Sequence, residues 1–104
     1  MTLDDFWRNL RDKLQKQVVI RNWTRDNGYL GQGDFGAIFR DGYIECHPPE
    51  AENPQKVPKQ DFRFMYENWK DYTEGRIKRS QLRDRSRFTK YTISILHQYE
   101  DLME

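Results

Sequence analysis

The residues best suited to chemistry lie between Arg76 and Lys90, in the stretch RIKRSQLRDRSRFTK. This stretch has seven basic side chains and one acidic side chain, whereas the rest of the chain has 11 basic and 16 acidic residues. Basic groups neutralise nucleic-acid phosphates, and hydroxyls and the free amides of a helix start donate hydrogen bonds to them. The sequence therefore predicts a nucleic-acid-binding segment with nine contact residues: Arg76, Lys78, Arg79, Arg83, Arg85, Ser86, Arg87, Thr89 and Lys90.

Within this segment, Ser86 and Thr89 are expected to donate hydrogen bonds at the start of the last helix, and the basic side chains to neutralise phosphates of DNA or RNA. Helix-turn-helix proteins present base-reading side chains on the second of two helices joined by a turn, and the predicted order of elements here is the same. The spacing from Gly75 to Ser86 is, however, longer than the turn of that motif. A second interpretation stays open. Residues 41–74 hold eight acidic and four basic residues, and ion pairs with them, each worth ~0–1 kcal/mol, give an ordinary solvated surface.

A glycine-rich motif, LGQGDFGAIFR, occupies residues 30–40. Its G-x-G-x-x-G spacing, with Phe35 before the last glycine, resembles the glycine-rich loop of protein kinases, which implies backbone amides placed over nucleotide phosphates. The resemblance covers about eleven residues, and a kinase also needs a lysine on its third strand and two aspartates in a second lobe. A dinucleotide-binding motif has to open a helix, whereas Asp41-Gly42 predicts a hairpin. We expect the glycines to serve tight turns, with no bound nucleotide.

A second set of chemical side chains is Asp34, Asp41, Glu45 and His47. Glu45 and His47 are two residues apart on a predicted strand, so their side chains share a face. With an upstream aspartate, this order loosely fits a metal-dependent nuclease, which is our third functional hypothesis. The position that would hold a lysine is His47, and Asp41 is placed in the turn. We therefore favour a protein that is not an enzyme and needs no cofactor or metal.

The remaining nucleophiles and histidines give no catalytic pattern. Ser86, Ser94 and His97 do not belong to a nucleophile-elbow motif, and His97 is expected on a helix surface or partly packed. Cys46 is the single cysteine, so no disulfide can form within the chain, and we expect a small buried hydrophobic residue in a cytoplasmic protein. Residues 2–7 do not lead into a continuous apolar segment, and the longest apolar runs of the chain are a few residues, so no secretory signal and no membrane partner are expected.

Three helices are predicted from apolar residues repeating every three or four positions. The first covers residues 2–16, with Thr2 as its cap and Asp4 and Asp5 in its first turn. The second begins near Pro58 or Asp61 and ends at Gly75. The third runs from Ser86, as its cap, to about Leu102, and residues 80–85 form a short helical turn or a loop.

Strands are predicted for Val18-Val19-Ile20 and on both sides of the Asp41-Gly42 turn, at residues 37–39 and 43–47, because Asp-Gly between apolar runs is a strong hairpin signal. Four prolines in residues 48–58 predict a loop there. The fold class is therefore α+β: an N-terminal helix, a small antiparallel sheet of three strands, and two C-terminal helices packed on the sheet. At 104 residues, the chain is expected to form a single domain.

A protein-interaction or self-association module is the alternative function. Aromatic residues make up 14% of the chain, and rings together with arginine are typical of interface hot spots. Four rings, Phe64, Trp69, Tyr72 and Tyr91, are not all needed on the apolar stripes of the helices, and Phe64 and Tyr91 in particular fall off the main faces. A protein partner or a homodimer would cover them.

Overall fold

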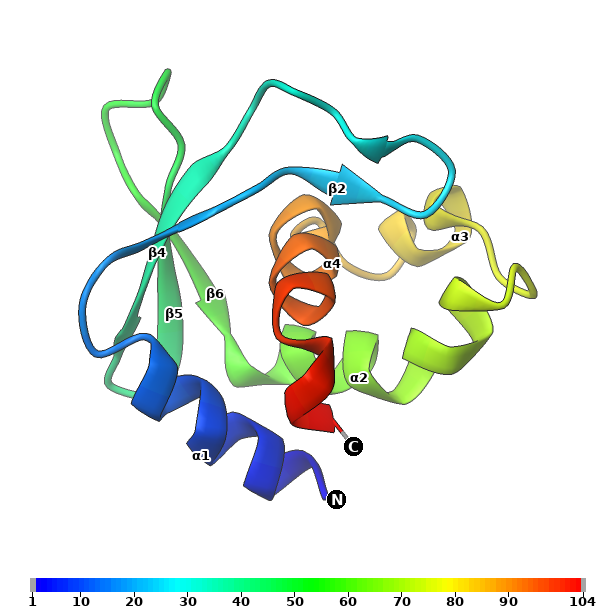
Figure 1. The fold of residues 1–104 in the computed structure, drawn as a ribbon, viewed down its shortest axis with the longest axis horizontal. Coiled ribbons are helices and arrows are strands. Elements are labelled where there is room, and N and C mark those ends of the chain that lie inside the picture. Colours follow the sequence, from blue (N-terminus) through cyan, green and yellow to red (C-terminus); the bar gives the residue numbers. More distant parts are fainter. Residues whose placement is uncertain (1, 104) are drawn as a thin grey trace.

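The computed structural model describes residues 2–103, and these residues have an α+β fold (Figure 1). The predicted class is confirmed, and none of the described helices is long and apolar enough to cross a membrane. In chain order the elements are α1 (Leu3–Lys13), β1 (Val18–Ile20), β2 (Trp23–Thr24), β3 (Gly28–Tyr29), β4 (Phe35–Arg40), β5 (Tyr43–His47), β6 (Gln55–Pro58), α2 (Lys59–Thr73), α3 (Arg79–Arg83), α4 (Thr89–Gln98) and the 3-10 helix η1 (Glu100–Met103).

The main sheet is antiparallel and has the strand order β1-β4-β5-β6. The predicted hairpin joins β4 to β5, where Gly42 takes a φ of +77° that residues with a side chain rarely adopt. The sheet has four strands, so the prediction of three strands, with a loop throughout residues 48–58, was wrong. The prolines do not prevent β6 because it is an edge strand, and Pro58 is its last residue.

A separate two-stranded ribbon, β2–β3, lies within the turn-rich segment where the sequence predicted no strand. Each strand has two residues, which is too short to give an alternating pattern. The backbone N–H of Trp23 donates to Ser94 Oγ at 3.1 Å, and Ser94 Oγ donates back to the Trp23 carbonyl at 3.4 Å. The ribbon is therefore held by a side chain of α4 and not only by its own pairing.

The helices follow the predicted order with different ends. Thr2 caps α1, as predicted, and its Oγ1 accepts from the Asp5 amide at 3.2 Å. Gly75 follows α2 with a φ of +81°, which fits the predicted end of that helix. The predicted start of the last helix was wrong, because α4 begins at Thr89 with Phe88 as its cap residue. The side chain of Ser86 is turned toward α2 instead of the α4 start.

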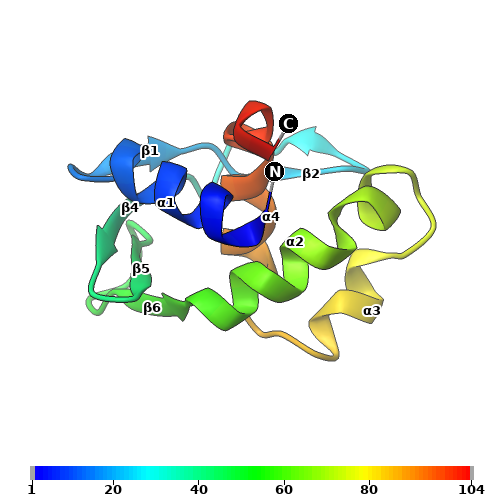
Figure 2. The same ribbon diagram turned by 90° about the horizontal axis from the view of Figure 1, so that it is seen from below.

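The last helix, α4, lies in the centre of the molecule. The main sheet flanks it, the β2–β3 ribbon crosses it, and α2 runs along another side (Figures 1 and 2). Residues 92–96 are all buried, so α4 has no solvent-facing side along that stretch. The core formed around it includes fully buried side chains from every large element, among them Phe6, Phe35, Ile44 and Phe62.

Two of the four rings considered for an exposed surface are buried. Trp69 is 6% exposed and Tyr72 is 1% exposed, so neither is available to a partner. Trp69 Nε1 donates to Glu100 at 2.9 Å, and the Tyr72 hydroxyl accepts from the Arg25 backbone N–H at 3.0 Å. The Tyr72 contact comes from the turn of the β2–β3 ribbon, which the sequence did not predict, whereas the Trp69 contact comes from η1, within the segment predicted as the last helix. The other two rings are partly buried against the core.

His97 joins the ribbon to the end of α4. Its imidazole stacks on Trp23 with 3.7 Å between ring centroids and 1° between planes, and its Nε2 lies 3.3 Å from the Tyr29 hydroxyl. Partial burial lowers the pKa of His97 below its ordinary value of 6.5, while Glu100 acts in the opposite direction. His97 is thus partly packed, as the sequence predicted.

This arrangement predicts a pH dependence of stability. The unfolded chain binds a proton on His97 at a higher pH than the folded chain does, so the free energy of unfolding should fall as the pH drops below about 6.5. Urea unfolding followed by circular dichroism, at pH values from about 7 to 5, should show this decrease in the wild type and a flatter profile in His97→Gln. Equal slopes for wild type and His97→Gln would contradict the prediction.

Candidate functional site

The basic segment predicted from the sequence lies at one edge of the molecule. It comprises the loop after α2, the short helix α3 and the loop that leads to α4, and it runs along the outside of α2 (Figure 2). We call the six cationic side chains from Lys78 to Lys90 the basic edge.

Arg76, at the start of the segment, is not free. Its Nε donates to Asp71 at 2.8 Å, and its two terminal nitrogens donate to the Glu74 carboxylate at 3.1 Å each. These bonds raise the pKa of Arg76 further and lower the pKa of Glu74. Arg76 therefore pairs with acidic residues of the 41–74 segment, as the second interpretation predicts. We place Arg76 with the end of α2 and leave it out of the basic edge.

The other six basic residues form no ion pair with any side chain among residues 2–103. They are Lys78, Arg79, Arg83, Arg85, Arg87 and Lys90. The guanidinium of Arg85 lies 5.3 Å from the Phe64 ring centroid, and that of Arg87 lies 4.7 Å from the Phe88 ring centroid. Contacts with rings hold an arginine stem in place while its nitrogens remain able to bind an anion.

The two predicted hydroxyl donors lie inside the fold. Ser86 is 7% exposed. Its Oγ donates to Asp61 at 2.6 Å and accepts from the Phe88 amide at 3.3 Å. Thr89 is 2% exposed. We leave both out of the basic edge because their side chains are covered. Thr89 and residues 92–96 of α4 are buried, so α4 does not present a row of base-reading side chains as a helix-turn-helix protein would.

Arg25, in the β2–β3 turn, adds a cationic group that sequence analysis missed. Its Nη2 pairs with Asp26 at 2.8 Å, and its Nη1 would lie 3.2 Å from a Cβ at Gly75. Arg25 therefore lies against the loop after α2. In the sequence, Arg25 is only one arginine in a turn. No local pattern shows that this turn packs against Gly75, which lies 50 residues farther along the chain.

Arg25 and Arg79 share one unusual property. Among residues 2–103, they are the two whose Nε atoms are buried without a hydrogen-bond partner. Burial lowers the pKa of Arg79, and the nearby Arg83 lowers it further. A buried donor without a partner is costly, and in both residues the unpaired atom is Nε and not a terminal nitrogen.

Lys90 links the basic edge to the glycine-rich loop. Its Nζ would lie 3.3 Å from a Cβ at Gly33, and Gly33 has a φ of +76°. The loop itself is fixed by Asn22, which donates from its side chain to the Gln32 carbonyl at 3.0 Å and from its backbone to Asp34 at 2.9 Å. The loop leads into strand β4 rather than a helix, which agrees with a role of the glycines in turns.

The residues of the nuclease hypothesis do not gather in one place. Asp34 is bound to Asn22, and Asp41 is exposed in the hairpin turn. Glu45 and His47 do share a face, with 2.7 Å between Glu45 Oε1 and His47 Nε2. Within residues 2–103 there is no group of three or more His, Cys, Asp or Glu side chains that could hold a metal ion. These residues give the nuclease hypothesis no assembled site.

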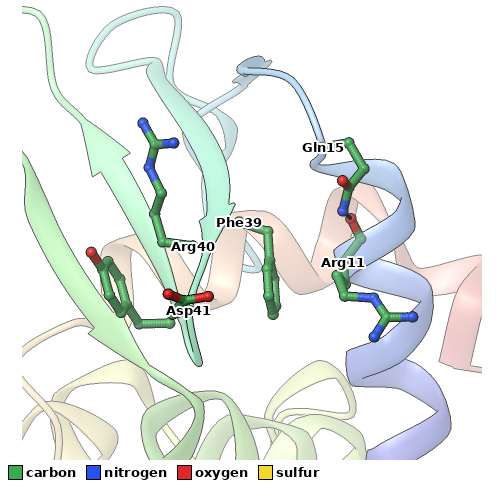
Figure 3. Close-up of a pocket in the computed structure, with 6 residues that line it drawn as sticks. Arg11, Gln15, Phe39, Arg40 and Asp41 are labelled. Carbon is green, nitrogen blue, oxygen red and sulfur yellow. Dashed lines mark hydrogen bonds between the residues drawn. The ribbon is translucent and has the colours of Figure 1, made fainter.

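The surface has a hollow between α1 and the β4–β5 hairpin (Figure 3). Its volume is about 600 Å³, and its lining includes Arg11, Gln15, Phe39, Arg40 and Asp41. A second hollow of about 610 Å³ shares three of these residues and extends along α1 toward the start of α2. Sequence analysis did not identify this surface, because it brings together residues from three separate elements.

None of the protein families, curated proteins or solved structures with which the chain was compared matches it. Function therefore has to be inferred from the geometry.

Cys46 should be chemically inert in the folded protein. It is fully buried, and burial, with a smaller effect of Glu45, raises its pKa to about 12. At pH 8 its reaction with Ellman's reagent should be more than about a hundredfold slower in buffer than in denaturant, because almost no thiolate is present or accessible. Comparable rates in the two solutions would contradict the burial of this residue.

Ser86 should matter for stability. Ser86→Ala removes the hydrogen bond to Asp61 and leaves that carboxylate in a partly buried position without this donor, which should cost about 1–3 kcal/mol in the free energy of unfolding. The matched control is Ser80→Ala, an exposed serine on α3, which should change stability by less than about 0.5 kcal/mol. Urea unfolding gives the free energy of unfolding of both variants. Equal changes in the two variants would show that the Ser86–Asp61 hydrogen bond does not stabilise the fold.

Proposed function

We propose that the protein binds DNA or RNA through the basic edge, as a non-enzymatic protein of the cytoplasm. One observation carries this proposal: six cationic side chains between Lys78 and Lys90 have no ion-pair partner among residues 2–103, although the chain as a whole has nearly as many acidic as basic residues. Acidic groups of the same chain pair with Arg76 but leave the following basic residues uncompensated. A polyanion supplies the missing charge.

The kind of contact follows from the elements that carry the charges. The helix α3 has five residues, about 7.5 Å in length, and α4 is buried, so neither can lie in a major groove and read base edges. The arginines instead present guanidinium groups along an edge, which suits phosphate contacts. We therefore infer weak and salt-sensitive binding with little sequence preference.

The test is a titration of labelled single-stranded DNA, duplex DNA and RNA of about 20 nucleotides at salt concentrations from about 25 to 200 mM. The variant reverses three exposed charges: Arg83→Glu, Arg85→Glu and Arg87→Glu. We expect wild-type affinity to fall steeply with salt, by a factor set by the number of phosphates contacted, and the variant to lose most of it, because like charges now face the phosphates.

The matched control reverses three exposed lysines outside the basic edge, Lys13→Glu, Lys16→Glu and Lys56→Glu, which gives the same change in net charge. This variant should keep most of the wild-type affinity and salt slope. Equal losses in the two variants would show that net charge acts alone. No binding of any of the three nucleic acids at the lowest salt concentration would refute the proposed function.

A further inference from the structure

Two arginines of the basic edge lie over aromatic rings. The guanidinium carbon of Arg85 is 5.3 Å from the ring centroid of Phe64, and that of Arg87 is 4.7 Å from the ring centroid of Phe88. A guanidinium is planar and has two flat faces, of which a single ring covers only one. Both arginines are exposed, and neither has an ion-pair partner among residues 2–103. Each of them therefore has a flat cationic face that is open to a ligand.

The two rings beneath these arginines are fixed by the core. Phe88 is 8% exposed and belongs to the buried core, and Phe64 of α2 packs against that core. Phe88 is also 6.5 Å from Tyr91, measured between ring centroids. A side chain that rests on a fixed ring has fewer conformations to lose when it binds a ligand. The open faces of the two arginines are thus partly ordered before any ligand arrives.

The two arginines are close neighbours in space. They are separated by Ser86, whose hydroxyl donates to Asp61 of α2 at 2.6 Å and holds the loop there. Two residues of chain span at most about 7 Å, so the Cα atoms of Arg85 and Arg87 lie within that distance of each other. Nucleic-acid bases stack on guanidinium planes as they do on aromatic rings. Two such planes side by side suit bases that are close together in one strand.

A duplex cannot use the flat faces of these arginines. Its bases are stacked 3.4 Å apart along each strand, and only their edges are open in the grooves. A base has to be unstacked before a guanidinium can lie on its face. In addition, the exposed carboxylate of Asp84 lies between Arg83 and Arg85 in the chain and interrupts the series of cations. This interruption suits a strand that places its phosphates at separate points.

We infer that the basic edge binds single-stranded nucleic acid, with bases stacked on the guanidinium groups of Arg85 and Arg87. The other four cations contact phosphates: Lys78, Arg79, Arg83 and Lys90. This binding mode rests on the proposed function and adds to it the kind of strand that is selected and the contact that selects it. DNA and RNA both have bases that stack, so the selection is for an unpaired strand and not for one sugar.

The first experiment uses the wild-type protein and three labelled probes of about 12 nucleotides. They are a DNA strand of mixed sequence that does not pair with itself, the duplex of this strand with its complement, and a strand of abasic nucleotides, which has the same phosphates but no bases. Fluorescence anisotropy at about 50 mM salt gives the three affinities. The single strand should bind about tenfold more tightly than either of the others, because only its bases can stack on the arginines.

The second experiment replaces both arginines by lysine, in the variant Arg85→Lys and Arg87→Lys. Lysine keeps the charge but has no planar group. Affinity for the single strand should fall about tenfold, to that of the abasic strand, while the affinity for the abasic strand and the salt slope stay as in the wild type. The matched control is Arg8→Lys and Arg11→Lys, two exposed arginines of α1, which should bind all three probes as the wild type does.

The outcomes separate this binding mode from the proposed function. If the wild type binds none of the three probes at low salt, both are refuted. If it binds the duplex or the abasic strand as tightly as the single strand, binding to the basic edge stands and the stacking of bases is overturned. Equal single-strand affinities of the wild type and the Arg85→Lys, Arg87→Lys variant would overturn the stacking as well.

Discussion

The burial of α4 on all sides is the constraint on which the rest of the structure depends. A ten-residue helix with five consecutive buried residues needs cover in every direction, and the sheet, α2, α3 and the β2–β3 ribbon each provide part of it. The helix even contains a fully buried serine, Ser94, whose hydroxyl would be costly there without partners. Its bonds to the Trp23 backbone satisfy it and fix the ribbon, whose own strands of two residues give few bonds.

This constraint also explains the basic edge. Because α2 and α4 both belong to the core, the chain that joins them has to pass around the outside of α2. Only Leu82 of α3 is buried, and the Ser86–Asp61 bond ties the loop after it to α2. The basic residues therefore lie at the surface on a segment anchored at both ends, by Arg76 and by Ser86. Anchoring lowers the entropy lost when such a segment binds a ligand.

Sequence patterns were sufficient where one local signal determined the outcome. The cap at Thr2, the Asp41-Gly42 hairpin and the end of α2 before Gly75 follow from single residues in specific roles. The patterns failed where distant elements decide. A strand of four residues between prolines, a ribbon of two-residue strands and the cover over Trp69 depend on partners far along the chain. The same holds for the site, because the charge of the basic segment is local, whereas the pairing of Arg76, the burial of Ser86 and the approach of Arg25 are tertiary.

The prolines that made residues 48–58 resemble a loop have a further effect on the finished sheet. Its outer strand, β6, ends at Pro58, which has no N–H to offer to another chain, and Pro54 precedes its first residue. The opposite edge, β1, is only three residues long. Open edges are the places where sheets of different molecules join and aggregate. Both edges of this sheet are thus poor templates for a fifth strand, and a concentrated solution of the folded protein should resist growth of that kind.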